Sequence, residues 1–474
     1  MVQHLMSDNS YSDRKQWKID VLDSKSASFC GAKWYNSSMW LFSGTTTSCH
    51  HNPVHNIDLE AIKTNPQALH NTEIKKNERA MMKAGEKPLN CQFCWVMEEA
   101  DPDGLADRTW LSLQATDDQL QQAFDAPAEQ DFDLTYLEVA FDRTCNMGCA
   151  YCGPSVSSTW VKDIKKNGPY QSLATDNRNY YGTTWDQSVL YDFNDTNPYA
   201  EAFFKWWDSG LYKTMKQLRI TGGEPLMSGH TWRLMEWLKN NPKESDFRLE
   251  LTTNLNYDRE TLDRFLDYCT EINNPVWIFT SGESIGAQGE YVRHGLEWEQ
   301  WVSNLEYVIQ HPAIQGVYVI STIGAPGIDS YAKFLEYMLE LKQRPDTKEM
   351  HVTTNLVRFP TFQNIVILSQ ELRDMYADQL EVFVARKEVP DYFRVQELDN
   401  ITRLIKYLRT METPHKEEQK KHDSTTYEQS DYKVNVDALR QDFKQFITQF
   451  DRRRGTDFAA TFPNLKEFYD SISI

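Results

Sequence analysis

Residues 134–152 read LTYLEVAFDRTCNMGCAYC, and this stretch decides how the rest of the chain is interpreted. A strand-like run, Leu134 to Phe141, leads into three cysteines that fall within eight residues, at Cys145, Cys149 and Cys152. Three thiolates on one short loop can bind three irons of a cubane cluster and leave the fourth iron without a protein ligand. Zinc sites usually combine separate cysteine pairs, and this loop holds no second pair. The spacing therefore favours an iron–sulfur cluster.

Strands and helices alternate regularly after this loop. The expected strands are 134–141, 217–220, 248–252, 276–280, 316–322 and 350–357, and the expected helices between the later ones are 200–213, 231–240, one from 259, 298–310 and 331–342. Six such βα units imply a parallel sheet and suit a partial (βα)6 TIM-like barrel. Ligands of these sheets bind at the carboxyl ends of the strands. We therefore expect an α/β fold with its site at those ends.

Polar and glycine residues stand at these expected strand ends. Gly222-Gly223-Glu224-Pro225 follows the second strand, Asn254 the third and Ser281 the fourth. Two glycines let a backbone approach a ligand closely, and a carboxylate accepts hydrogen bonds from an ammonium group. An ordinary βα turn is the alternative reading of the glycines. Their place after the cysteine loop favours a ligand site.

Four further cysteines, Cys30, Cys49, Cys91 and Cys94, lie in the first hundred residues. The first two bracket an expected strand and turn around Trp40, and an expected helix over 59–86 leads back to the last two. Four thiolates brought together in this way suit either a fully ligated iron–sulfur cluster or a structural zinc. The neighbouring histidines could each replace a cysteine as a zinc ligand, namely His50, His51 and His55.

Composition narrows the class of protein. The 474 residues carry a net charge of −19, which argues against a nucleic-acid partner. The short basic run Arg452-Arg453-Arg454 is expected to be a solvated helix face. The chain lacks both an apolar signal segment and a run of membrane-spanning length, so we expect a soluble, cytoplasmic protein with no membrane partner. Eight cysteines in such a protein indicate metal or redox use.

Three regions are expected: 1–130 with the four cysteines, 131–385 as the core, and 386–474 as a helical C-terminal extension. The extension should contain helices at 396–408 and 434–451 around a charged linker at 413–433. The polar and aromatic segment 168–197 is expected to be a long loop. Cys269 is expected to be a small core residue of a helix.

The CxxxCxxC loop after a first strand, with Tyr151 before its last cysteine, resembles the signature of the radical S-adenosylmethionine (SAM) enzymes. The resemblance implies a [4Fe-4S] cluster on Cys145, Cys149 and Cys152 whose open iron binds SAM. The reduced cluster would cleave SAM to a 5′-deoxyadenosyl radical that abstracts hydrogen from a substrate. Gly222, Gly223, Glu224 and Pro225 match the family's "GGEP" motif, which binds the amino group of SAM.

The same resemblance assigns three more positions near SAM. Asn254 matches a polar position of the third strand, Ser281 a serine that contacts SAM, and Arg293 an arginine that pairs with its carboxylate. Here Ser281-Gly282-Glu283-Ser284 departs from the usual Ser-x-Asp-Gly and leaves the role of Glu283 open. An equally favoured alternative is that Arg293 and Glu283 form a salt bridge with a structural role only.

The N-terminal region resembles the twitch, or half-size SPASM, module, although it precedes the core here. The resemblance implies a second [4Fe-4S] cluster on Cys30, Cys49, Cys91 and Cys94, with zinc as the alternative. A peptide side chain is the favoured substrate, and a small alcohol or sugar-like molecule is the alternative. A flavodoxin or ferredoxin would supply electrons. The alternative hypothesis assigns the chain to another class of protein, namely a non-catalytic binding protein that zinc stabilises.

Overall fold

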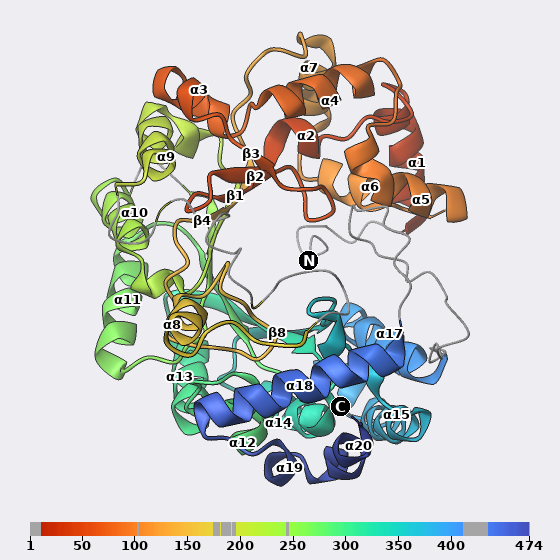
Figure 1. Ribbon diagram of the computed structural model, residues 1–474. Helices are drawn as coiled ribbons and strands as arrows, with labels where there is room; N and C mark the ends of the chain where they lie inside the picture. Colours follow the sequence, from red (N-terminus) through yellow and green to blue (C-terminus); the bar gives the residue numbers. More distant parts are fainter. Residues whose placement is uncertain are drawn as a thin grey trace.

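The computed structural model is a mixed α/β fold built on one nine-stranded sheet (Figure 1). The strand order is β3-β2-β1-β4-β5-β6-β7-β8-β9. The structure describes residues 11–101, 104–173, 181, 191, 196–242, 246–410 and 435–473. Most of the expected 168–197 loop and the whole 413–433 linker therefore lie outside the described residues.

The six expected strands are all present and pair in parallel, in chain order. They are β4 (Tyr136–Ala140), β5 (Gln217–Thr221), β6 (Arg248–Thr252), β7 (Val276–Ser281), β8 (Ile314–Ile323) and β9 (Glu349–Leu356). Their side chains include fully buried aliphatic residues such as Leu137, Leu218 and Ile278, and helices cover these residues. Burial of this apolar surface stabilises the parallel arrangement.

Helices lie between the strands, as the sequence predicts. They are α8 (Ser158–Asn167), α9 (Pro198–Ser209), α10 (Gly229–Asn240), α11 (Arg259–Glu271), α13 (Trp298–Gln310) and α14 (Tyr331–Gln343). In Figure 1, α9, α10, α11 and α13 follow one another along the outer side of the sheet. Side-chain caps fix several of their starts, since Ser157, Asn197 and Asp258 each accept a backbone N–H of the first turn. Two further helices were not predicted, α12 (Gly286–Val292) and α15 (Gln370–Val384).

The N-terminal strands extend the same sheet. They are β1 (Asn36–Trp40), β2 (Thr45–Thr47) and β3 (His55–Asn56). The first two form the expected antiparallel hairpin, with Gly44 in its turn at φ +63°. β1 also pairs in parallel with β4, from Asn36 opposite Tyr136 to Trp40 opposite Ala140. The hairpin that precedes Cys49 is therefore fixed to the strand that leads into Cys145.

The N-terminal helices pack around a core of their own, which includes Phe29, Trp34, Met82 and Leu120. These helices are α1 (Tyr11–Trp17), α2 (Ala32–Tyr35), α4 (Glu73–Lys83), α5 (Gln92–Ala100), α6 (Asp107–Ser112) and α7 (Asp117–Asp125). α3 (Leu59–Thr64) instead packs on the main core, against α9. The prediction of one helix over 59–86 is wrong. Pro66 starts a separate 3-10 turn because proline lacks the N–H that a continuous helix needs, and Thr72 then caps α4.

The C-terminal extension is helical, as expected. It comprises α16 (Val389–Tyr392), α17 (Val395–Thr410), α18 (Val436–Arg454), α19 (Phe458–Thr461) and α20 (Lys466–Ser471). On α18, Phe446 stacks on Tyr170 at a ring distance of 5.1 Å and approaches Trp160 at 6.2 Å. This packing places α18 against α8, the helix that follows the cysteine loop.

The prediction that Arg452-Arg453-Arg454 form a solvated face is wrong for the last two. The side chains of Arg453 and Arg454 are 5% and 4% exposed, and both pair with Asp163 of α8. They also stack on aromatic rings, Arg453 on Tyr170 and Arg454 on Trp160. They tie the extension to the core. Within the described residues, no helix combines the length and the apolar character needed to cross a bilayer.

We predict that Phe446→Ala destabilises the chain by about 3–5 kcal/mol, because it leaves a cavity among fully buried aromatic side chains. Urea unfolding followed by tryptophan fluorescence measures this change. The control is Val382→Ala on α15, whose side chain is 70% exposed and which should change stability by less than about 0.5 kcal/mol. Equal effects of the two substitutions would show that α18 does not stabilise the core.

Candidate metal centres and ligand site

The cysteine loop, residues 145–152, is held by backbone bonds on one side and by α8 on the other. Gly148 N–H donates to the carbonyl of His294 at 2.8 Å, and Ala150 N–H donates to that of Val292 at 2.7 Å. The Thr159 hydroxyl donates to the carbonyl of Cys145 at 2.7 Å, and the Trp160 indole donates to that of Cys149 at 3.0 Å. These bonds fix the backbone and leave the three sulfurs free of covalent partners.

The three thiols of this loop lie half-buried and close to one another. Burial raises the pKa of all three, and the neighbouring cysteines raise those of Cys145 and Cys152 further, the latter to about 12. Thiols in such surroundings stay protonated at neutral pH unless a metal replaces the proton. Across the described ranges, no three His, Cys, Asp or Glu side chains converge on a point that would hold a single metal ion.

The Gly222-Gly223-Glu224-Pro225 turn packs directly on the entrance of the cysteine loop. Gly222 adopts φ +135°, and a Cβ there would lie 2.7 Å from the Asp142 carbonyl oxygen. A Cβ on Gly223 would overlap the carbonyl oxygens of Arg143 and Thr144. Glu224 N–H donates to Thr144 O at 2.6 Å. The glycines thus permit the close approach of two loops. From the sequence, we interpreted them as permitting the close approach of a ligand.

Glu224 connects this turn to the end of β6. Its carboxylate is 1% exposed and accepts the Asn254 N–H at 2.7 Å and the Leu226 N–H at 3.3 Å. Burial raises the pKa of Glu224 to about 7. The Asn254 side chain donates to the side-chain amide oxygen of Asn146, inside the cysteine loop, at 2.7 Å. The predicted motifs therefore meet through hydrogen bonds, although Asn146 was not singled out from the sequence.

Arg293 and Glu283 form a buried ion pair beside the loop. Arg293 follows α12, and its guanidinium donates to Glu283 at 2.6 Å and 3.1 Å. Tyr151 donates its hydroxyl to the same carboxylate at 3.2 Å, and Arg293 Nη1 lies 4.0 Å from Cys149 Sγ. The salt-bridge alternative is therefore found in the structure. Ser281 ends β7 and is half-buried.

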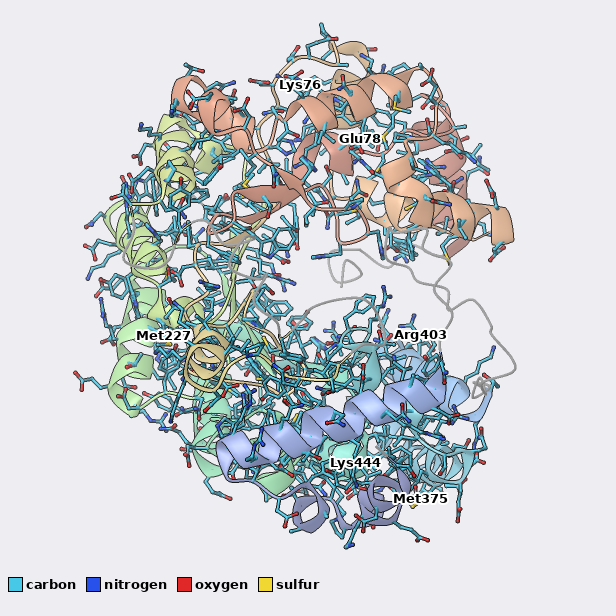
Figure 2. The ribbon with its side chains drawn as sticks, viewed as in Figure 1. Lys76, Glu78, Met227, Met375, Arg403 and Lys444 are labelled. Atoms are coloured by element: carbon cyan, nitrogen blue, oxygen red, sulfur yellow. The ribbon has the colours of Figure 1, made fainter. Side chains whose placement is uncertain are left out.

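The four N-terminal cysteines line one small cavity of about 20 Å³. Cys30 and Cys91 are buried, which raises their pKa values to about 11 and about 12, and burial also raises the pKa of Cys94. Lys33 lies in the cavity wall and forms a buried ion pair with Glu78, which stands on α4 (Figure 2). Its charge lowers the pKa values of Cys30, Cys49 and Cys91.

The three nearby histidines separate in space. His51 lines the four-cysteine cavity, where it pairs with Asp107 and stacks on Phe93 at 3.6 Å. His55 bonds to the Thr72 hydroxyl at 2.9 Å, and burial lowers its pKa to about 4. His50 lines a different cavity, on the sheet. Among the three, only His51 is placed to replace a cysteine as a ligand.

Cys269 is buried in α11 and packs in the main core, as expected. Pro225 is buried at the start of a 3-10 turn, where its missing N–H is not needed. Lys33 and Glu78 were not identified from the sequence. They lie 45 residues apart, and a buried pair at that separation leaves no local sequence pattern.

No protein-family model and no curated protein matches the chain. Among solved structures, it is similar to Streptococcus suis SuiB bound to S-adenosylmethionine, with 12% identity and a TM-score of 0.35 over 74% of this chain and 69% of SuiB. TYW1 with a lysine-pyruvate adduct bound shows 15% identity and a TM-score of 0.26, over 50% of this chain and 70% of TYW1. Similarity at this level assigns neither a family nor an activity, so the function depends on the residues themselves.

We predict that Glu283→Gln lowers the free energy of unfolding by about 3–5 kcal/mol, because it leaves the Arg293 charge buried without its partner. Urea denaturation of the purified chain measures the change. The control is Glu201→Gln, which breaks an ion pair with Arg233 whose partners are 42% and 46% exposed, and should cost under about 1 kcal/mol. Similar small losses in both variants would contradict the prediction.

Proposed function

We propose that this chain is a radical SAM enzyme, with a [4Fe-4S] cluster held by Cys145, Cys149 and Cys152. The observation that carries the proposal is the hydrogen-bonded contact between residues 142–144, which enter the cysteine loop, and the Gly222–Pro225 turn, at the carboxyl ends of neighbouring parallel strands. Such strand ends are where ligands of parallel sheets bind. We also propose that the six parallel strands form a partial barrel.

The donor set fits the group. Three thiols on one rigid backbone supply three ligands, and the same loop holds no fourth cysteine, so one iron would stay open. When bound, the cluster supplies the electron that cleaves SAM to a 5′-deoxyadenosyl radical, which takes hydrogen from the substrate. The chain's task is to fix the thiols, bind SAM next to them and exclude water.

Glu224 would accept hydrogen bonds from the amino group of SAM. The backbone N–H groups of Asn254 and Leu226 and the side chains of Thr253 and Tyr257 also face this carboxylate, so SAM would share it with them. Asn254 would support SAM at the next strand end, and Ser281 at the one after. Arg293 would meet the SAM carboxylate through Nη1, since Glu283 occupies its Nε and Nη2. Tyr151 would hold Glu283 in place.

For the N-terminal site we propose a second [4Fe-4S] cluster on Cys30, Cys49, Cys91 and Cys94, with region 1–130 as a twitch-like module. The four thiols line one cavity, and within the described residues no three of them converge on a point that would hold a single ion, which supports a cluster over zinc. Zinc ligands, in contrast, converge to about 2.3 Å from a single centre. The favoured substrate is a peptide side chain, and electrons would come from a flavodoxin or ferredoxin.

We predict about eight irons per chain after anaerobic reconstitution with iron and sulfide, measured by metal analysis. Cys149→Ala should remove about four irons and abolish 5′-deoxyadenosine formation from SAM and dithionite, because it removes one of three cluster ligands. Cys94→Ala should remove about four irons and keep SAM cleavage.

Cys269→Ala serves as the matched control, since loss of this buried core thiol should change neither the iron content nor 5′-deoxyadenosine formation. SAM cleavage by the Cys149→Ala variant would contradict the proposed function. About four irons together with bound zinc in the unsubstituted chain would indicate that the N-terminal site holds zinc and not a second cluster.

We predict that SAM binds more weakly at about pH 6 than at about pH 8. Burial raises the Glu224 pKa to about 7, so acid protonates the carboxylate and removes the acceptor for the SAM ammonium. Cys145 also faces this carboxylate, and it would be held as an iron ligand in the reconstituted protein. Calorimetric titration with SAM measures the affinity. Glu224→Gln should bind about tenfold more weakly without this pH dependence, and exposed Glu299→Gln should behave like the unsubstituted chain.

A further inference from the structure

Lys33 stands on α2, in the wall of the four-cysteine cavity. Its side chain is 3% exposed and pairs with Glu78, whose side chain is 7% exposed. Removing an ammonium group from water is costly unless charged and polar partners compensate for the lost hydration. Glu78 supplies one such partner, and the cavity that Lys33 faces is lined by thiols.

The Lys33 charge acts on three of these four thiols. Burial raises the pKa of Cys30, Cys49 and Cys91, and the ammonium lowers the pKa of each. Glu78 raises the pKa of Cys91, but it does so by less than Lys33 lowers it. At Cys91 the cation therefore outweighs its own carboxylate partner.

Asn52 connects Lys33 to Cys49. Its side-chain oxygen accepts a hydrogen bond from Lys33 Nζ, and its side-chain nitrogen donates to the Asn90 carbonyl oxygen at 3.3 Å. The amide atom on the Asn90 side lies 3.1 Å from Cys49 Sγ. Because Lys33 and Asn90 make that atom the nitrogen, it can donate an N–H to a Cys49 thiolate.

Arg108 is another buried cation of the cavity wall, and its side chain is 2% exposed. Its guanidinium donates to Glu98 at 2.6 Å, to Asp23 at 2.8 Å and to the Phe29 carbonyl at 3.0 Å. Two carboxylates therefore offset the charge of Arg108, whereas Lys33 has one carboxylate partner. Of these two cations, Lys33 has the charge that is less compensated.

We propose that Lys33 and Asn52 raise the reduction potential of the iron–sulfur cluster on the four N-terminal cysteines. The potential of such a cluster depends on nearby charge, on hydrogen bonds to its sulfurs and on solvent exposure. Reduction adds one negative charge, so a buried ammonium and an N–H donor stabilise the reduced form more than the oxidised form. The proposal rests on the proposed second cluster, and the contacts of Lys33 and Asn52 do not.

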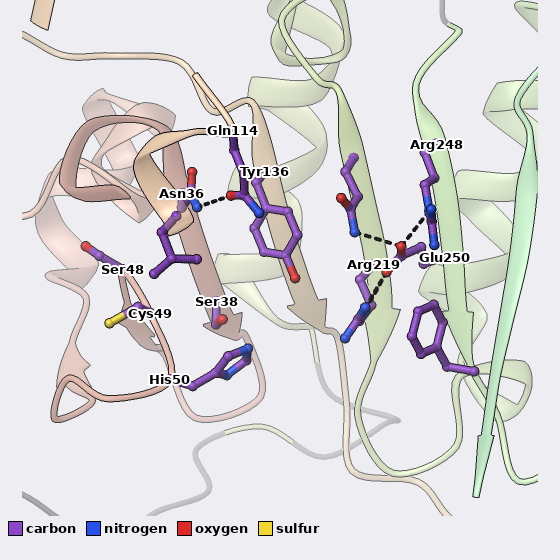
Figure 3. Close-up of a pocket in the computed structure, with 13 residues that line it drawn as sticks. Asn36, Ser38, Ser48, Cys49, His50, Gln114, Tyr136, Arg219, Arg248 and Glu250 are labelled. Carbon is purple, nitrogen blue, oxygen red and sulfur yellow. Dashed lines mark hydrogen bonds and ion pairs between the residues drawn. The ribbon is translucent and has the colours of Figure 1, made fainter. Parts of the chain in front are cut away.

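Cys49 is the N-terminal cysteine that follows a strand of the main sheet. Besides the four-cysteine cavity, it lines a second small cavity on the sheet, together with Ser48 and His50 (Figure 3). In Figure 3, its sulfur points away from the sheet residues Tyr136 and Arg219. The hairpin therefore holds the Cys49 backbone at the sheet, and Asn52 meets its sulfur on the other side.

The test is a potentiometric titration of the reconstituted full-length Cys149→Ala variant, in which only the N-terminal cluster is expected. Electron paramagnetic resonance measures the reduced cluster. At the midpoint potential of this parent, adding Lys33→Met should lower the ratio of reduced to oxidised cluster about tenfold, a shift of about 59 mV for one electron. Lys33→Arg keeps the positive charge and should stay within about twofold of the parent.

Asn52→Leu removes the N–H donor and should lower the same ratio about threefold. It leaves no ion without a partner, so it keeps the test valid if Lys33→Met fails to fold. The control is Lys63→Met in the same region. It breaks an ion pair with Glu60 whose side chains are 57% and 75% exposed, and it should leave the midpoint unchanged.

An unchanged midpoint in Lys33→Met or in Asn52→Leu would overturn the proposal. A fall in Lys33→Arg as large as that in Lys33→Met would do the same, because it would show that packing and not charge sets the potential. Metal analysis distinguishes these failures from a failure of the second cluster. About four irons in the parent with unchanged midpoints would contradict only the role of Lys33 and Asn52. A parent without iron would contradict the second cluster and, with it, this proposal.

Discussion

The close approach of the turn after β5 to the loop that enters the cysteines is the constraint on which the rest of the site depends. Gly223 has no room for a side chain there, since a Cβ would overlap two carbonyl oxygens of the neighbouring loop. In return, the backbone N–H of Glu224 reaches Thr144 at 2.6 Å. Any larger residue would separate the two loops and the thiols from the buried carboxylate. The glycine is thus a packing requirement first, and a ligand site follows from the geometry it permits.

A second constraint is the parallel pairing of β1 with β4. It joins a segment near residue 40 to one near residue 140 and makes the N-terminal strands part of the main sheet. Because the hairpin leads directly to Cys49, this pairing also fixes one N-terminal thiol beside the sheet face. The N-terminal helices keep a separate hydrophobic core, so two cores meet along one continuous sheet. The cavity next to Cys49 lies at that junction.

The sequence predicts the six parallel strands well, because each is a short apolar run bounded by turn residues and followed by a periodic helix. It also places the strand-end motifs correctly. It does not predict that β1 joins the sheet, since the strand reads NSSMW and its polar side chains are buried only through pairing with a distant segment. The burial of the arginines of α18 is not predicted for the same reason. Their partner Asp163 lies about 290 residues away, and a local charge run resembles a solvated face.

The charges around the two cysteine sites follow one arrangement. Arg293 lies between the Glu283 carboxylate and the Cys149 thiol, and Lys33, paired with Glu78, faces the N-terminal thiols. A buried ion pair gains little stability over an apolar pair, because removing two charges from water offsets their attraction. Its effect here is on the thiols, since each cation lowers the pKa of the sulfur beside it while burial raises that pKa. Both sites therefore already contain the cation that a deprotonated, metal-bound thiolate would need in a buried position.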